Sequence, residues 1–240
     1  MTNNVASTDD PRASSGAAPD PLSLWESLHF LVTNRIPRRW STLAYARFSR
    51  IEVGWIVRFS IWVWQRFGGD LNLHEAEQRP FRSLNDCFTR RLLPGARPID
   101  DDPEAIVSPC DAVVGACGRV DGDRLVQAKG HDYTLMELLQ DAALARRCHD
   151  GTYVTLRLRS SFYHRFHAPD RATVSEVNYI AGDAWNVHPI ALRKIPRLFC
   201  RNERAVIDCQ LHDGRRLLLV PVAAILVASI RLHWLEQDLD

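Results

Sequence analysis

Two histidines three residues apart are the residues of this sequence best suited to chemistry near neutral pH. They are His164 and His167, in the segment Ser-Phe-Tyr-His-Arg-Phe-His-Ala-Pro at residues 161–169. Imidazole titrates close to neutrality, so such a pair can take up a proton in one step and return it in another. Pairs of this kind also occur on ordinary surfaces, so their spacing alone does not separate a catalytic role from a structural one.

The residues before the pair predict a strand that would hold it in place. Residues 153–159, Tyr-Val-Thr-Leu-Arg-Leu-Arg, alternate apolar and polar side chains with a period of two, which indicates a half-buried strand. Pro169 closes the segment that follows. We therefore expect the histidines near a strand end, where a rigid scaffold can present a titratable side chain to a pocket.

A carboxylate that could support one of these imidazoles is Asp111, in the sequence Val-Ser-Pro-Cys-Asp-Ala at residues 107–112. A carboxylate bonded to one ring nitrogen fixes the tautomer and stabilises the protonated ring. The alternative role of Asp111 is an Asx turn at the start of the next strand. Residues 127–133 and 198–204 also concentrate polar side chains, although each segment is weak evidence by itself.

The patterns of the remaining sequence predict an α+β fold that would position these residues. It consists of N-terminal membrane-associating helices followed by a β-rich catalytic domain of mostly antiparallel strands. Residues 1–21 are rich in Ser, Ala, Asp and Pro without apolar periodicity and are expected to form a disordered tail. Residues 22–92 are expected to form the helical membrane-associating region. Residues 93–240 are expected to form the β-rich catalytic-type domain.

The predicted helical region is basic and aromatic. Its helical pattern is broken near Pro37, and between Trp25 and Phe67 it contains seven arginines and two glutamates. Tryptophans interleaved with arginines suit helices that lie in a membrane interface, where indole and guanidinium groups both find partners. The apolar run at residues 53–64 is too short and too charged to span a bilayer. The alternative is that these helices pack on the protein's own body.

The β-rich region combines a series of strands with a few local signals. Asp121-Gly122 predicts a hairpin turn, and Thr134 with Glu137 forms a capping box that would open a helix from Leu135 to Arg147. Pro221 interrupts the last strand, where a bulge or an edge is expected. A short helix is expected at residues 81–88, and strands are expected at residues 112–120, 124–127, 152–159, 171–180, 203–211 and 216–230.

Overall composition excludes some classes of function. The formal net charge of +1 argues against a general nucleic-acid binder. The six cysteines show neither a Cys-x-x-Cys pair nor a zinc spacing, and no secretory leader is evident before them. We therefore expect reduced thiols in a cytosolic compartment.

Together and in this order, the polar segments resemble the phosphatidylserine decarboxylase family, the pyruvoyl-dependent enzymes that make phosphatidylethanolamine. The resemblance runs from about Ile36 to Trp234. The segments that carry it are residues 81–90, 97–100, 108–111, 127–130, 151–156, 163–169 and 199–204.

The resemblance implies a mechanism and roles for three residues. In that family a proenzyme cuts itself before a serine, which becomes the N-terminal pyruvoyl group of a small subunit and forms a Schiff base with the substrate amine. Such a group is needed because loss of carbon dioxide from an amino acid leaves a carbanion that no ordinary side chain can delocalise. The resemblance assigns Asp111 and His167 to self-cleavage and His164 to decarboxylation. It implies phosphatidylserine as substrate and a peripheral position on the cytoplasmic face of a membrane, with a homodimer as one option.

The serine that would form the pyruvoyl group does not map onto these 240 residues. The family's cleavage point is a Gly-Ser-Thr element beyond the position of Ser229-Ile230, and no glycine in this sequence is followed by serine. Ala112 also stands where family members usually have glycine. The pyruvoyl group is therefore expected to come from a missing C-terminal segment or from a small pyruvoyl-bearing subunit, which leaves this chain inactive alone and its β-rich domain incomplete.

Three other hypotheses stay open from the sequence. A non-catalytic homologue or regulatory chain would bind phosphatidylserine without releasing carbon dioxide. A metal hydrolase would use the two histidines with Asp170, Asp183 or His188, although the pair is not the helical His-Glu-x-x-His arrangement of zinc enzymes. A lysine Schiff base would use Lys129, whose Lys-Gly-His-Asp-Tyr context indicates a loop. We expect no metal.

Overall fold

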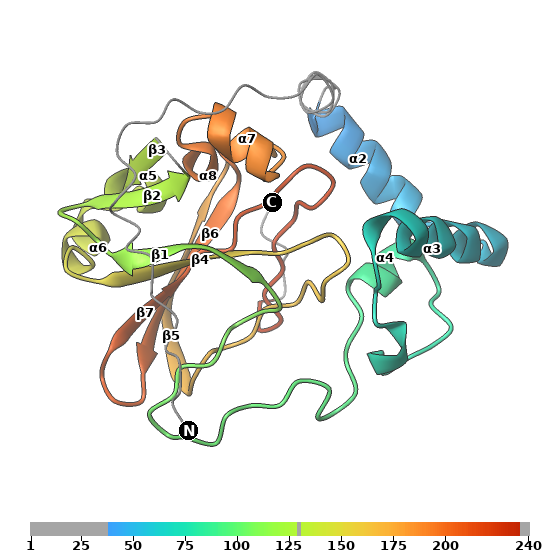
Figure 1. The fold of residues 1–240 in the computed structure, drawn as a ribbon, viewed down its shortest axis with the longest axis horizontal. Helices are drawn as coiled ribbons and strands as arrows, with labels where there is room; N and C mark the ends of the chain where they lie inside the picture. The colour runs from blue at the N-terminus through green and yellow to red at the C-terminus, as the bar shows by residue number, and fades with distance from the viewer. Residues whose placement is uncertain (1–37, 129–130, 236–240) are drawn as a thin grey trace, which may run out of the picture.

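The computed structural model describes residues 38–128 and 131–235. The predicted tail, residues 22–37 of the predicted helical region, and Lys129 lie outside these ranges. The described chain combines short helices with antiparallel sheets, which confirms the α+β class (Figure 1). The division of the chain at residue 92 stays a prediction.

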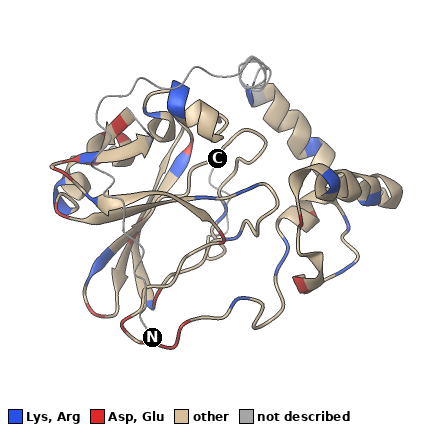
Figure 2. Ribbon diagram, viewed as in Figure 1, with Lys and Arg blue, Asp and Glu red and all other residues tan. Residues whose placement is uncertain are grey.

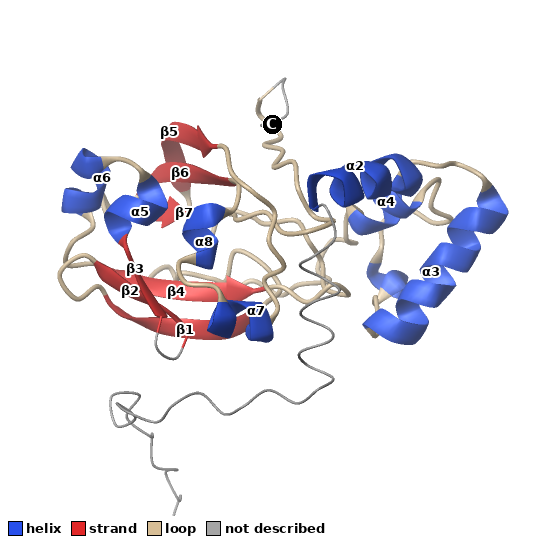
Figure 3. Ribbon diagram, turned by 90° about the horizontal axis from the view of Figure 1, so that it is seen from above, coloured by secondary structure: helices blue, strands red, loops and turns tan. Residues whose placement is uncertain are grey.

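The first helices along the described chain gather on one side of the molecule, next to the β-rich body (Figures 1 and 3). They are α2 (Arg38–Ser49), α3 (Gly54–Gly68), the short 3₁₀ turn η1 (Leu73–Glu75) and α4 (Leu84–Phe88). Helix α4 begins where the Ser83 hydroxyl accepts a hydrogen bond from the backbone N–H of Asp86 (3.0 Å), an N-cap that confirms the short helix expected here. None of the described helices has the length and apolar character needed to cross a bilayer.

Helix α2 is fastened to the β-rich body at its first turn. The guanidinium of Arg38 lies 3.6 Å from the ring centre of Trp185 and forms an ion pair with Asp183. One turn later, Thr42 Oγ1 accepts a hydrogen bond of 3.3 Å from the backbone N–H of Leu226. The helix therefore packs on the body at one end, as the alternative interpretation of this region expected.

Seven strands form three sheets in which every pairing between named strands is antiparallel. The strands are β1 (Val113–Arg119), β2 (Arg124–Ala128), β3 (His131–Thr134), β4 (Thr152–Arg157), β5 (Ala172–Ile180), β6 (Arg204–Leu211) and β7 (Arg216–Leu219). Strand β1 pairs with β4, β2 pairs with β3, and β6 lies between β5 and β7. Strand β7 ends before Pro221, whose ring nitrogen cannot donate to a ladder, so the strand predicted at 216–230 is much shorter than expected.

The predicted hairpin between β1 and β2 is only partly correct. Its turn forms, because Gly122 adopts a positive φ of 66° and the backbones of Asp121 and Arg124 exchange two hydrogen bonds. The strands then separate into different sheets. The cause is visible at Val120, whose N–H donates to the carbonyl of Gly151 (2.8 Å) instead of to β2.

The helix predicted from Leu135 to Arg147 is wrong in its length. The capping box forms as expected, with Thr134 Oγ1 accepting from the N–H of Glu137 (3.1 Å) and the Glu137 carboxylate accepting from the N–H of Thr134 (2.9 Å). Helix α5 (Leu135–Leu139) then stops at Gln140, which adopts a left-handed φ of 52°. Asp141 caps a second helix, α6 (Ala142–Arg147). Two further helices, α7 (Pro189–Lys194) and α8 (Leu198–Arg201), were not predicted from the sequence.

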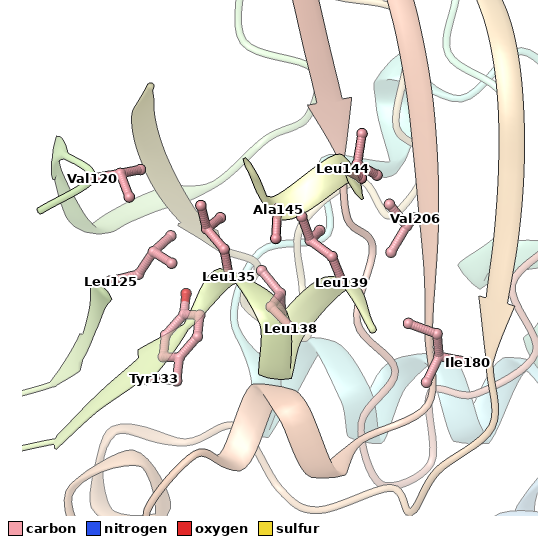
Figure 4. Close-up of a cluster of buried hydrophobic side chains, with 10 residues drawn as sticks. All are labelled: Val120, Leu125, Tyr133, Leu135, Leu138, Leu139, Leu144, Ala145, Ile180 and Val206. Carbon is pink, nitrogen blue, oxygen red and sulfur yellow. The ribbon is translucent and has the colours of Figure 1, made fainter. Parts of the chain in front are cut away.

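Strand β6 forms the centre of the core because its two faces are both covered. Val206 joins the cluster drawn in Figure 4, which α5, α6 and the β2–β3 pair complete. Ala205, Ile207 and Cys209 point to the opposite face and pack with Ile230 and Leu232. This alternation follows the period of two along a strand, and it makes β6 the buried scaffold to which the other elements attach.

Candidate active site

Two segments that are far apart in the sequence run side by side and bring the chemistry-bearing residues together. The N–H of Val107 donates to the carbonyl of Pro169 (3.0 Å), and the N–H of His167 donates to the carbonyl of Pro109 (2.8 Å). The segment containing Asp111 therefore lies antiparallel to the segment containing both histidines. Each segment adjoins one strand of the β1–β4 pair, because β1 begins at Val113 and β4 ends at Arg157.

Asp111 is held by an arginine. Arg97 donates from Nε to Oδ1 (2.9 Å) and from Nη2 to Oδ2 (2.7 Å), the two-pronged geometry that suits guanidinium and carboxylate. The same arginine reaches Glu75 through Nη1 (2.9 Å). Hydrogen bonding to Asp111 is the main cause that raises the pKa of Arg97, so the guanidinium stays protonated. Within the described residues no hydrogen bond joins Asp111 to either histidine, so its expected role beside an imidazole stays a prediction.

Cys110, next to Asp111, is not suited to act as a nucleophile. Burial, together with a smaller contribution from the Asp111 carboxylate, raises the pKa of its thiol to about 11. A thiol needs its deprotonated form to attack, and that form is scarce here at neutral pH. Asp111 therefore stays the candidate of this segment for a chemical role.

His167 forms a pair with Tyr163, which lies four residues before it in the sequence. The tyrosine hydroxyl and the Nε2 of His167 are 3.0 Å apart, and the rings stack with centroids 5.6 Å apart. Tyr163 is buried, and burial raises the pKa of its hydroxyl, so the phenol stays neutral. Sequence reasoning included Tyr163 in the motif but gave it no role. The sequence feature that could have indicated its role is a hydroxyl-bearing aromatic residue immediately before the first histidine.

His164 lies in an apolar setting that favours its neutral form. Its Nδ1 is 2.8 Å from the carbonyl oxygen of Phe162, and its ring centre is 4.2 Å from that of Phe88. A carbonyl only accepts, so Nδ1 carries the hydrogen and the Nε2 of the neutral ring has a free lone pair. Burial is the main cause that lowers the pKa of His164. The ring is thus set to accept and return a proton at Nε2.

A pocket of about 290 Å³ lies against these groups. The side chains that matter on its wall are those of Asn72, Arg90, Arg97, Asp111, Ser161 and Tyr163. The two histidines are not on the wall itself. Each is one contact behind it, because Phe162 and Tyr163 line the pocket and hold His164 and His167 by the hydrogen bonds given above.

Comparison with known proteins agrees with this arrangement. The family model for phosphatidylserine decarboxylase matches residues 84–239. A phosphatidylserine decarboxylase proenzyme of Shewanella sediminis is 35% identical over 202 residues, which cover 83% of this chain and 70% of the relative. One from Ruminiclostridium cellulolyticum is 41% identical over 166 residues, 69% of this chain and 55% of the relative. This chain belongs to the phosphatidylserine decarboxylase family.

In this decarboxylase-family chain, the matched range contains Asp111, His164 and His167 together with Arg90, Arg97 and Tyr163. Asn72, which lines the pocket, precedes that range, so part of the pocket wall comes from the helical side of the molecule. The assignment of roles to the three residues picked from the sequence stays a prediction, whereas their gathering around one pocket is a feature of the structure.

Another motif picked from the sequence serves the fold of this family member and not its chemistry. Arg204 is buried and donates only to backbone carbonyls, those of Leu138 (2.7 Å), Cys200 (2.8 Å), Asn202 (2.9 Å) and Glu137 (3.0 Å). The Gln127 side chain likewise bonds the backbone of Leu192, Ile195 and Leu198. Such buried polar side chains satisfy helix ends and loops that would otherwise lack partners.

The ligand sets required by a metal hydrolase are not assembled in the part of the chain that the structure describes. There, no group of three or more His, Cys, Asp or Glu side chains is arranged to hold a metal ion. Asp183 is paired with Arg38, and Asp170 is paired with His212 (3.2 Å). The metal hypothesis therefore has no support in the geometry.

Proposed function

We propose that this chain catalyses the decarboxylation of phosphatidylserine to phosphatidylethanolamine, together with a pyruvoyl group whose serine lies outside these 240 residues. One observation carries the proposal: in a chain of this family, the pairing of residues 107–109 with 167–169 gathers Asp111, Tyr163 and both histidines around a single pocket.

The residues present fit a pyruvoyl group. The pocket wall combines polar side chains with Ala112 and Phe162, a mixed lining that suits a small carbonyl-bearing group. When bound, a pyruvoyl group supplies a carbonyl that takes up the electron pair left by departing carbon dioxide. Side chains of this chain would hold it and exclude water from it.

His164 is proposed to manage the proton of the reaction. Its Nε2 accepts a proton in the neutral ring and can return it to carbon, while Nδ1 stays bonded to the carbonyl of Phe162. The ring of Phe88 packs against this imidazole and shields that side of it from water. A substrate carboxylate that enters such apolar surroundings loses hydration, which favours release of neutral carbon dioxide.

Asp111 and His167 are proposed to act in forming the pyruvoyl group. Arg97 fixes the carboxylate, and Tyr163 fixes the imidazole through Nε2. The two residues are joined through the backbone pairing of their segments and not through their side chains. A serine brought to this pocket would meet Asp111 on the wall, with His167 directly behind Tyr163.

The small partner is proposed to bind at the β1–β4 pair. Val114 and Val154 are exposed on this two-stranded sheet, and among the described strands β1 has β4 as its only neighbour. An unpaired edge with apolar side chains readily accepts another strand. Because Val113 follows Asp111 by two residues, a segment added here would lie next to the pocket.

Peripheral binding at the cytoplasmic face of a membrane is the second part of the proposal. Trp55, Phe59 and Trp62 of α3 expose about 60% of their surface. Figure 2 shows blue and no red along α2 and α3, and neither helix contains an acidic residue. Exposed indole rings beside arginines suit an anionic lipid surface. Cosedimentation with vesicles containing phosphatidylserine should fall when Trp55 and Trp62 are both replaced by serine; equal cosedimentation would contradict this part.

The decarboxylase proposal is tested by supplying the missing element. We expect that co-expression with a segment carrying Gly-Ser-Thr yields a processed N-terminal pyruvoyl group, seen by mass spectrometry, and carbon dioxide release from phosphatidylserine vesicles. Saturable binding of phosphatidylserine without carbon dioxide release, in a processed protein, would favour a non-catalytic homologue. Absence of both phosphatidylserine binding and carbon dioxide release would reject the proposal.

A further inference from the structure

The pocket contains a buried arginine whose positive charge has no ion-pair partner among the described residues. Arg90 exposes only 6% of its surface. It donates from Nη1 to the carbonyl of Cys87 (3.1 Å) and from Nη2 to the carbonyl of Leu71 (2.7 Å), so both bonds go to neutral groups. Its Nε is buried without a hydrogen-bond partner. A buried charge in this condition is costly, which points to a ligand that completes it.

Other donors on the same wall are also without partners. The side-chain amide of Asn72 and the hydroxyl of Ser161 line the pocket and make no side-chain hydrogen bond within the described residues. Arg97, in contrast, is already engaged by Asp111 and Glu75. The free hydrogen-bonding capacity of the pocket is therefore grouped around Arg90.

The local field also favours an anion on this side of the pocket. The charges that act on Tyr163 are those of three arginines, Arg165, Arg90 and Arg91, and of one carboxylate, Asp111. An arginine surrounded by amide and hydroxyl donors is a common setting for the oxygens of a phosphate. The cavity of about 290 Å³ is at the lower end of the range for ligand pockets and suits a headgroup better than an acyl chain.

We propose that Arg90, with Asn72 and Ser161, binds the phosphodiester of the phospholipid headgroup, and that this contact orients the amino-acid end toward His164 and Asp111. The proposal rests on the decarboxylase function for the identity of the ligand. It makes Arg90 a residue that contacts the part of the substrate that does not react.

A phosphodiester fits the chemistry of this site better than the substrate carboxylate does. The negative charge of the carboxylate disperses as carbon dioxide leaves, so an ion pair with Arg90 would stabilise the ground state more than the transition state. The charge of the phosphodiester does not change during the reaction. Binding energy gained there can position the reacting end without opposing the loss of carbon dioxide.

The test is a calorimetric titration of the 240-residue chain with three soluble probes. These are glycerophosphoserine, glycerophosphoethanolamine, which lacks the carboxylate, and free serine, which lacks the phosphate. We expect both phosphodiesters to bind with similar affinity and free serine not to bind. Arg90→Gln should weaken binding of both phosphodiesters at least tenfold. Arg82→Gln, which removes the same charge from an exposed arginine that does not line the pocket, should leave their affinities within twofold.

Some outcomes would overturn the proposal. Failure of both phosphodiesters to bind would do so, as would equal binding by a folded Arg90→Gln variant. Binding of serine but not of glycerophosphoethanolamine would place the carboxylate at Arg90 instead. If Arg90→Gln does not fold, Ala112→Leu serves in its place, because it narrows the pocket while keeping Arg90, and it should abolish binding.

These results are independent of the test of decarboxylation. If the complete enzyme releases carbon dioxide and Arg90→Gln binds the headgroup as well as the unchanged protein does, the proposed role of Arg90 is rejected. The proposed decarboxylase function is then still supported. Headgroup binding that depends on Arg90, without carbon dioxide release from a processed protein, would support the binding site and reject catalysis.

Discussion

Arg97 holds the carboxylate of Asp111 through two hydrogen bonds, of 2.9 Å from Nε and 2.7 Å from Nη2, and its third nitrogen binds Glu75. These residues come from three separate segments: η1, the connector before β1 and the turn at the start of β1. The aspartate proposed for self-cleavage is thus oriented by an arginine that also joins the helical side of the molecule to the β-rich body.

Replacing Arg97 with lysine should separate geometry from charge. Arg97→Lys keeps the positive charge but cannot bind both carboxylate oxygens in parallel. Because the pair is partly exposed, the free energy of unfolding should fall by only about 1 kcal/mol, whereas self-cleavage of the complete proenzyme should slow by about tenfold or more. Urea unfolding and gel mobility measure the two effects.

The matched control for this change is Arg82→Lys. Arg82 pairs with Glu52 at 2.8 Å, with both side chains mostly exposed and far from the pocket wall. Its replacement should change the free energy of unfolding by less than about 0.5 kcal/mol and leave cleavage unchanged. Normal cleavage in Arg97→Lys would show that the orientation of Asp111 is not needed.

Removing the hydroxyl of Tyr163 should impair processing with little loss of stability. Tyr163→Phe deletes the 3.0 Å hydrogen bond to His167 but keeps the stacked ring. One such bond contributes about 1 kcal/mol to folding, so the protein should stay folded while the rate of self-cleavage falls. Tyr153→Phe is the control, because its hydroxyl also makes one hydrogen bond, to the N–H of Val126 (3.2 Å), outside the pocket. Equal cleavage rates in the two variants would exclude a positioning role for Tyr163.

Most strands of this fold follow from local sequence, whereas β3 and the pairing of the strands do not. Residues 131–133 were expected to lie in a loop, and they belong to β3. Alternating patterns located β4, β5 and β6 closely, and the capping box at Thr134 located the start of α5. The predicted pairing of β1 with β2 was wrong because Val120 forms its backbone hydrogen bond with Gly151. A local sequence pattern around Val120 does not include Gly151. The break of the long helix at Gln140 likewise depends on a left-handed residue that is not glycine, for which the sequence offers no clear signal.

The candidate site was predictable in part for the same reason. Spacing and the neighbouring strand drew attention to His164, His167 and Asp111, and the structure places all three near one pocket. The arginine that binds Asp111 could not be assigned, since the pairing of Arg97 with Asp111 depends on how the connector folds back. In the polar segment at residues 198–204, Asn202 and Arg204 are buried donors to backbone groups and do not line the pocket.

The environment of His164 makes a prediction about pH. Burial lowers the pKa of this ring from 6.5, so the folded protein resists a proton that the unfolded chain accepts. The stabilisation from neutral His164 is therefore fully present above the unfolded pKa of about 6.5 and is lost as the pH falls toward the folded-state pKa. His164→Phe, which keeps a ring against Phe88, should flatten this part of the pH dependence of the unfolding free energy. An NMR titration of His164 with a midpoint above 6.5 would contradict the prediction.

Arg204 offers a test of the distinction between residues of the fold and residues of the site. Arg204→Met fills a similar volume but leaves the carbonyls of Leu138, Cys200, Asn202 and Glu137 without their donor, so we expect the free energy of unfolding to fall by about 3 kcal/mol or more. Arg201→Met, at an exposed position in the same segment, should change it by less than about 0.5 kcal/mol. Arg204 contacts no part of the pocket wall, so the folded fraction of Arg204→Met should bind glycerophosphoserine with unchanged affinity. A variant that is stable but has lost headgroup binding would instead place Arg204 in the site.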